Sequence, residues 1–285
     1  MNSHGVWKRL LRNRLALAGL IFLGFMAVAA LVGPAIMPYG FAQQVPADRL
    51  LAPGGSHTLG TDDLGRDVLS RLVSGVRISL GVALAVECVV VVLGLVVGLV
   101  AGYFGGWIDN LLVGTTNVML SFPDVLLAVL LLGTLGAKDA GPYQSLVLVV
   151  LALGITGWPP LARLVRGQVL SLRRREFVEA AVALGAGNGR ILVRHILPNL
   201  ISPVIVAVTV DAAGVILAEA TLSFLGIGVQ QPIPSWGRMI NDALAYYRSQ
   251  PMLLVWPSVC LSATVLALNF VGDGLRDALD PRERT

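Results

Sequence analysis

Several long apolar runs, separated by short polar segments, constrain this chain more than any other feature of its sequence. Of its 285 residues, 55% are hydrophobic and only 13% are charged, whereas soluble domains carry roughly 25% charged residues. A helix that spans a bilayer needs roughly 20 mostly apolar residues. The chain lacks the charged residues to cover a soluble domain of this size with polar surface, so we predict an all-α membrane protein.

The apolar runs predict six transmembrane helices. Their approximate ranges are 15–33, 78–103, 111–135, 145–164, 198–225 and 252–271. Pro123 interrupts the third run, and Pro159 and Pro160 lie near the end of the fourth. A cleaved signal peptide is the alternative for the first run. That run is long for such a peptide and no clear small-residue cleavage site follows it, so we expect an uncleaved helix.

Lysine and arginine residues cluster in the segments that six spans would place on one side of the membrane. Cytoplasmic loops are enriched in these residues, so the pattern predicts that both termini, residues 1–14 and 276–285, are cytoplasmic. The segments on this side hold fourteen of the 21 basic residues: Lys8, Arg9, Arg12, Arg14, Arg163, Arg166, Arg173, Arg174, Arg175, Arg190, Arg194, Arg276, Arg282 and Arg284. The reverse topology would place all of them outside.

The predicted outer loop, residues 34–77, ends in an amphipathic pattern. Val68, Leu72 and Val76 share one helical face, whereas Arg66 and Arg71 belong to the opposite face. This pattern is typical of a short helix at the membrane surface, and we expect one there. The remaining residues, 78–275, would form the transmembrane core.

The connection between the fourth and fifth spans, residues 173–187, predicts a second short helix. Residues 176–184 are good helix formers. The negative charge of Glu179 stabilises the N-terminal end of a helix, and Gly185 is typical of the C-terminal end. The segment is too short to span a membrane and too apolar to be left bare in water. It would either dock into a groove on a partner protein or lie on lipid, and its periodicity alone does not separate these possibilities.

The letters of this loop resemble the EAA signature of ATP-binding-cassette (ABC) importer permeases. The signature residues are Glu179, Ala180, Ala181, Gly185, Leu197 and Pro198. The match departs from the family pattern at His195, where isoleucine is common, and Ile196 follows one place later. The resemblance implies a type I importer permease fold in which the helix bearing Glu179 is the coupling helix.

Two further stretches resemble the peptide and nickel subgroup of this family, so that the resemblance covers essentially the whole chain. They are the run from His57 to Leu80 and the run from Asp273 to Arg282. The resemblance implies a second permease subunit of a dipeptide or oligopeptide importer in a bacterial cytoplasmic membrane. Its implied partners are a homologous permease, two cytoplasmic ATPase subunits that bind ATP and magnesium, and an extracytoplasmic substrate-binding protein.

Glu87, Asp211 and Glu219 fall within predicted spans, where a charge costs at least ~2.5 kcal/mol. They are candidates for lining the pathway, and the alternative is hydrogen bonding between helices. We expect Asp124, after Pro123, to belong to a structural break. In the outer loop, Arg66, Asp67 and Arg71 are candidates for organising the loop or contacting the binding protein, and the alternative is a solvated face.

No phosphate-binding GxxxxGK[ST] loop, HExxH motif or CxxC pair occurs in the sequence. We therefore expect a non-catalytic subunit that binds no cofactor or metal of its own, and no nucleic acid. Cys88 and Cys260 lie within apolar runs, so we expect no disulfide. Nickel chelate, glutathione or another small polar solute is the alternative cargo. A carrier that needs no ATPase is a more distant alternative, because it leaves the Glu179 loop unexplained.

Overall fold

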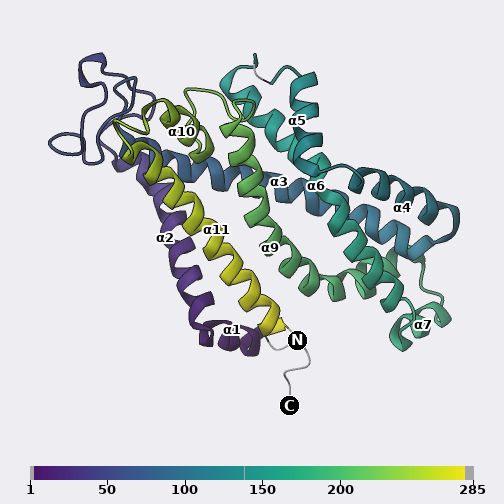
Figure 1. The fold of residues 1–285 in the computed structure, drawn as a ribbon. Coiled ribbons are helices and arrows are strands. Elements are labelled where there is room, and N and C mark those ends of the chain that lie inside the picture. The colour runs from purple at the N-terminus through teal and green to yellow at the C-terminus, as the bar shows by residue number, and fades with distance from the viewer. Residues whose placement is uncertain (1–2, 138, 280–285) are drawn as a thin grey trace.

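The computed structural model describes residues 3–137 and 139–279 and is built from helices (Figure 1). Five of its helices are long and apolar enough to cross a membrane: α2 (Arg14–Ile36), α3 (Val68–Phe104), α6 (Pro142–Leu172), the helix containing α9 (Leu197–Phe224), and α11 (Met252–Leu279). A sixth span results if α4 (Gly106–Leu120) and α5 (Asp124–Thr134) are counted together; they are bent by 87° around Pro123. The helical membrane fold expected from the sequence is therefore confirmed.

The shorter elements connect and cover these long helices. They are α1 (Ser3–Arg12), α7 (Glu176–Ala183), α8 (Asn188–Ile191), the π-helical turn Leu192–Ile196, α10 (Trp236–Ala243), and two 3-10 turns at Pro46–Asp48 and Leu244–Tyr246. We call residues 37–67 and 226–251 the cap. The cap lies at one end of the long helices, whereas α1, α7 and the end of α11 lie toward the other (Figure 1). Residues 280–285 of the predicted cytoplasmic tail lie outside the described residues.

The close packing of α3 against α6 positions the centre of the molecule. Gly94, Gly98 and Gly102 lie four residues apart on the face of α3 that meets α6. A Cβ atom added at Gly98 would lie 2.6 Å from the carbonyl oxygen of Ala162, so only glycine permits this approach. Small residues serve this role in membrane helices because lipid provides no hydrophobic force that drives helices together.

The structure differs from the sequence prediction at the start of α3. The expected separate surface helix at residues 66–77 does not form; Asp67 caps α3 by accepting a hydrogen bond from the backbone N–H of Ser70, and the helix continues unbroken from Val68 to Phe104. The predicted polar face is buried under the cap, as Ser70, Arg71 and Ser74 show. Two further helices, α1 and α10, were not expected from the sequence.

Candidate functional sites

The short helix α7 begins at Glu176, as the sequence predicted, and presents an exposed apolar surface. Val178 and Ala181 are buried on its inner face, whereas Phe177 and Val182 are exposed and Leu184 is 88% exposed. Glu179 and Ala180 also lie on the exposed side. Apolar surface of this kind on a short helix is typical of a docking element.

The end of α7 and its attachment are well defined. Gly185 has a φ of +78°, which glycine adopts without strain, and the N–H of Ala186 donates to the carbonyl of Ala181 at 3.0 Å. Leu197 and Pro198 lie in a different element, the first turn of α9, which directly follows the π-helical turn Leu192–Ile196. The structure therefore divides the predicted signature between an exposed helix and the start of a long one.

Polar contacts hold the segments on both sides of α7 against the ends of α3 and α4. The guanidinium of Arg173 donates to the carbonyl of Tyr103 at 3.1 Å, and the hydroxyl of Tyr103 donates to the side chain of Asn188 at 3.0 Å. Arg166 of α6 forms a two-pronged ion pair with Asp109 of α4, at 2.6 and 2.7 Å. These contacts connect the segments that flank α7 to α3 and α4.

Two of the cavities among the long helices share part of their walls. The larger, of about 490 Å³, lies between the α4–α5 bend, α6 and α9. The smaller, of about 120 Å³, lies between α3, α6 and α9. Pro160 and Asp211 line both cavities, Asp124 lines the larger one and Glu87 the smaller one. Sequence reasoning selected Glu87 and Asp211 but gave no sign that they meet, and it assigned Asp124 only to the break.

Glu219 is not a wall residue of either cavity. Its side chain is 1% exposed, and its carboxylate accepts a hydrogen bond of 2.7 Å from the hydroxyl of Ser223 one turn further along α9. The same hydroxyl accepts from the backbone N–H of Val229 in the cap at 3.0 Å. In this structure Glu219 faces neither cavity, because its side chain is sealed where α9 meets the cap.

Arg66, Asp67 and Arg71 are buried beneath the cap rather than exposed. Arg66 is 0% and Arg71 is 2% exposed. The Nε of Arg66 lies 2.6 Å from Asp62, and Asp67 contacts Nδ1 of His57 at 2.9 Å. In this structure these side chains are therefore enclosed by the outer loop and do not form a solvated face.

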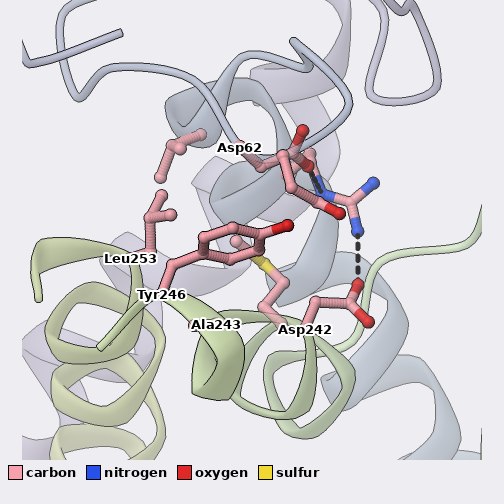
Figure 2. A pocket seen from close by; sticks show the side chains of 9 residues that line it. Asp62, Asp242, Ala243, Tyr246 and Leu253 are labelled. Carbon is pink, nitrogen blue, oxygen red and sulfur yellow. Dashed lines mark ion pairs between the residues drawn. The ribbon is translucent and has the colours of Figure 1, made fainter. Parts of the chain in front are cut away.

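Asp242 of α10 completes the buried charge cluster of the cap. Asp62 and Asp242 face each other across the pocket in Figure 2. Arg71 forms an ion pair with each of them, with nitrogen to oxygen distances of 3.4 Å to Asp62 and 3.9 Å to Asp242. Arg238 lies one turn before Asp242 and contacts it at 3.0 Å. Sequence reasoning missed this pair, although its i, i+4 spacing was a signal.

A solved structure shares the fold of this chain. The structure resembles that of the MetNI methionine ABC transporter in an inward-facing conformation, with a TM-score of 0.58, 20% sequence identity, and coverage of 74% of this chain and 97% of that chain. The likeness shows that the two chains share a fold, and this fold agrees with the all-helical membrane architecture expected from the sequence.

Sequence comparison then gives the family. Residues 94–285 match the family described as the binding-protein-dependent transport system inner membrane component, and residues 3–53 match the N-terminal transmembrane domain of oligopeptide transport permease C. The chain belongs to this family of inner-membrane permeases. It is a multi-pass, non-catalytic membrane subunit of a bacterial ABC importer. Membership of this family removes the independent carrier as an alternative.

Three curated relatives come from peptide and glutathione systems. The dipeptide transport system permease protein DppC of Alkalihalophilus pseudofirmus is 40% identical over 98% of this chain and 90% of its own length. The oligopeptide transport system permease protein OppC of Haemophilus influenzae is 40% identical over 97% of this chain and 88% of its own length. The glutathione transport system permease protein GsiD of Pectobacterium atrosepticum is 39% identical over 97% of this chain and 90% of its own length.

Proposed function

We propose that this chain forms half of the translocation pathway of an importer for di- or oligopeptides. It would pair with a second homologous permease, receive cargo from an extracytoplasmic binding protein and bind two cytoplasmic ATPase subunits. The residues facing the larger cavity would contribute to the pathway. The observation that carries this proposal is the exposed α7, which bears Glu179 and the apolar side chains of Phe177 and Leu184.

In this proposal α7 is the coupling helix and lies on the cytoplasmic side. Its exposed apolar side chains would enter a cleft in an ATPase subunit, and the contacts of Arg173 and Arg166 would pass motion of the ATPase to α3 and α4. The arrangement in Figure 1 supports cytoplasmic termini, because α1 and the end of α11 lie toward the same end as α7. Lys8, Arg9 and Arg12 lie in α1, and the run Arg173–Arg175 directly precedes α7.

The substitution Glu179→Lys tests the coupling assignment. It reverses a charge on the exposed side of α7 without changing the buried contacts of Val178 and Ala181. We expect at least about a fivefold loss of ATP-dependent dipeptide uptake, because a charge reversal in the centre of an interface costs more than about 1 kcal/mol. The ATPase subunits should also co-purify less completely in detergent.

A matched control is Asp139→Lys, which makes the same charge reversal at an exposed position in the connection between α5 and α6. It should leave uptake and co-purification unchanged. Normal ATP-dependent uptake by Glu179→Lys would show that α7 is not the coupling element.

Glutathione is the second candidate cargo, because the GsiD relative is as similar to this chain as the peptide permeases are. Competition separates the two cargoes. If the system imports peptides, an excess of unlabelled dipeptide should suppress uptake of a labelled dipeptide, whereas glutathione should not. Preferential suppression by glutathione would move the assignment to that cargo.

A further inference from the structure

Three acidic side chains from three helices lead from the larger cavity into the smaller one. Asp124, at the start of α5, and Asp211, in α9, line the larger cavity, and Asp211 and Glu87, in α3, line the smaller one. Asp124 and Asp211 are exposed, whereas Glu87 is only 5% exposed and lies at the inner end of the series. The exposure of the acids thus decreases from the larger cavity toward the smaller one, and the three side chains do not gather on one surface.

Glu87 has no structural partner that would explain its charge. Neither oxygen of its carboxylate has a hydrogen-bond partner among the described residues. Apart from Asp211, the residues that share its cavity are apolar: Val90, Pro160, Leu161, Leu164, Ala207 and Val208. An unpaired carboxylate in such surroundings costs several kcal/mol, so residues of this kind commonly face a substrate or ion.

The other buried acids of the chain show what a structural role requires. Glu219 accepts a hydrogen bond from Ser223, and Asp62 lies 2.6 Å from the Nε of Arg66. Glu87 has no such hydroxyl or guanidinium partner among the described residues, and the group that faces it is a second acid, Asp211. The site therefore offers negative charge without a compensating group from the part of the chain that the structure describes.

We propose that Glu87 and Asp211 form a subsite that binds the protonated amino group of the cargo during its passage, with Asp124 as an outer contact. This inference deepens the proposed function and rests on it. Carboxylates bind an ammonium group through charge-assisted hydrogen bonds, and the α-amino group of a peptide has a pKa of about 7.7–8.0 and is mostly protonated at neutral pH.

The size and composition of the site favour an ammonium group over a metal ion. Among the described residues, no group of three histidine, cysteine or acidic side chains is placed to hold a metal. The smaller cavity, of about 120 Å³, is large enough for an amino terminus and its first carbon atoms, since one water molecule occupies about 30 Å³ in the liquid. The rest of the cargo would remain in the larger cavity, so the cargo would enter this subsite with its amino terminus first.

Chemical labelling tests the subsite without requiring transport. In the purified complex of permeases and ATPases, a hydrophobic carbodiimide should modify Glu87, and mass spectrometry would measure the modified fraction. Alanyl-alanine should protect Glu87, whereas N-acetyl-alanyl-alanine, which lacks the charged amine, should need a concentration at least about tenfold higher, since a hydrogen bond to a charged group is worth about 1.5–3 kcal/mol. Equal protection by the two dipeptides, or protection by neither, would overturn the proposal.

Substitutions assign this protection to the acid pair. Asp211→Asn keeps the shape of the side chain but removes its charge, and it should raise the protecting concentration of alanyl-alanine about tenfold. Asp211→Glu keeps the charge and should restore most of the protection. Glu219 provides a control within the same complex, because its sealed position should make any modification independent of either dipeptide. Protection unchanged in Asp211→Asn would contradict the assignment.

Transport measurements separate failure of this inference from failure of the proposed function. In proteoliposomes with the binding protein and ATP, Glu87→Gln and Asp211→Asn should lower alanyl-alanine uptake several-fold, whereas the control Asp139→Asn should not. Co-purification of the ATPase subunits checks that each variant is folded and assembled. Wild-type protein without ATP-dependent uptake would refute the proposed function. Normal uptake by both cavity variants, beside an active wild type, would refute the subsite alone.

Discussion

The charged side chains under the cap and those along the cavities are both largely enclosed by protein, but they differ in what surrounds them. Under the cap, Arg66 lies within 2.6 Å of Asp62, and Arg71 lies between Asp62 and Asp242. At the smaller cavity, Glu87 has no basic or hydroxyl partner among the described residues, and the group that faces it is another acid, Asp211. Paired charges hold two segments of the chain together, whereas unpaired charges of one sign raise the free energy of the fold and suit the binding of a cation.

The paired charges also attach the cap to the transmembrane core. Arg66 and Arg71 lie near the start of α3, and Asp242 lies in α10, more than 160 residues later in the chain. Ion pairs across this separation fix α10 over the end of α3, while Arg71 also donates to the carbonyl of Phe41 in the other part of the cap at 3.3 Å. The cluster therefore joins both parts of the cap to the transmembrane core.

The largest effect is expected when a paired charge is removed from the cap. Arg66→Met retains much of the side-chain volume but leaves Asp62 and Asp63 without their nearest cation. Breaking a buried pair in this way costs about 3–5 kcal/mol. We therefore expect a large fall in the midpoint of thermal unfolding in detergent, or no recoverable folded protein.

Arg248→Met is the control for this substitution. Arg248 is exposed and contacts its neighbour Tyr247, with no ion pair among the described residues. Its loss should change stability by less than about 1 kcal/mol. Similar destabilisation by the two substitutions would show that burial and pairing do not distinguish Arg66.

A smaller loss is expected where a buried acid is held by a neutral group. Ser223→Ala removes the donor to Glu219 and the acceptor for the N–H of Val229. We expect a loss of about 1–3 kcal/mol, because buried polar groups are left unpaired. Thr209→Ala is the matched control in α9, since its hydroxyl donates only within its own helix, to Ile205. The midpoint of thermal unfolding in detergent should be well below that of this control for the Ser223 variant.

At the smaller cavity, removal of a charge should raise the stability of the protein and not lower it. Glu87→Gln removes a charge that the protein does not compensate, so we expect a gain in stability of roughly 1–2 kcal/mol while uptake falls. A residue with a purely structural role would lose stability and activity together. Comparison of the unfolding midpoint with the uptake rate of the same variant checks this, and a lower midpoint would place Glu87 with the paired charges.

The apolar runs predicted the long helices because bilayer thickness sets their length, and Glu176 and Gly185 predicted the bounds of α7 through local helix-end chemistry. Contacts between segments that are distant in the sequence could not be predicted in this way. The polar face at Arg66 and Arg71 has the pattern of a surface helix. In the structure this face is buried, and both arginines contact Asp242 of the distant helix α10. The meeting of Glu87 with Asp211 likewise depends on how α3 and α9 pack around α6.

The smallest predicted effect concerns Asp63, at the edge of the cap cluster. Burial is the main cause that raises the pKa of its carboxyl above the usual value, and the neighbouring charge of Asp62 adds to it, while Arg66 opposes them. The folded chain therefore holds this proton more tightly than the unfolded chain. The contribution of Asp63 to stability is most favourable below the ordinary pKa of aspartate, and it is lost as pH rises through the raised pKa.

Asp63→Asn replaces this carboxyl with a neutral group of similar shape. At neutral pH the variant should be more stable than the wild type by less than about 1 kcal/mol, because the site is partly solvated. The difference should disappear in acid, where the wild-type carboxyl is protonated. Paired unfolding midpoints of the two proteins from acid to neutral pH measure it, with Asp139→Asn as the control for losing an exposed charge. A variant less stable than the wild type at neutral pH would mean that attraction to Arg66 outweighs burial, and would place Asp63 among the paired charges of the cap.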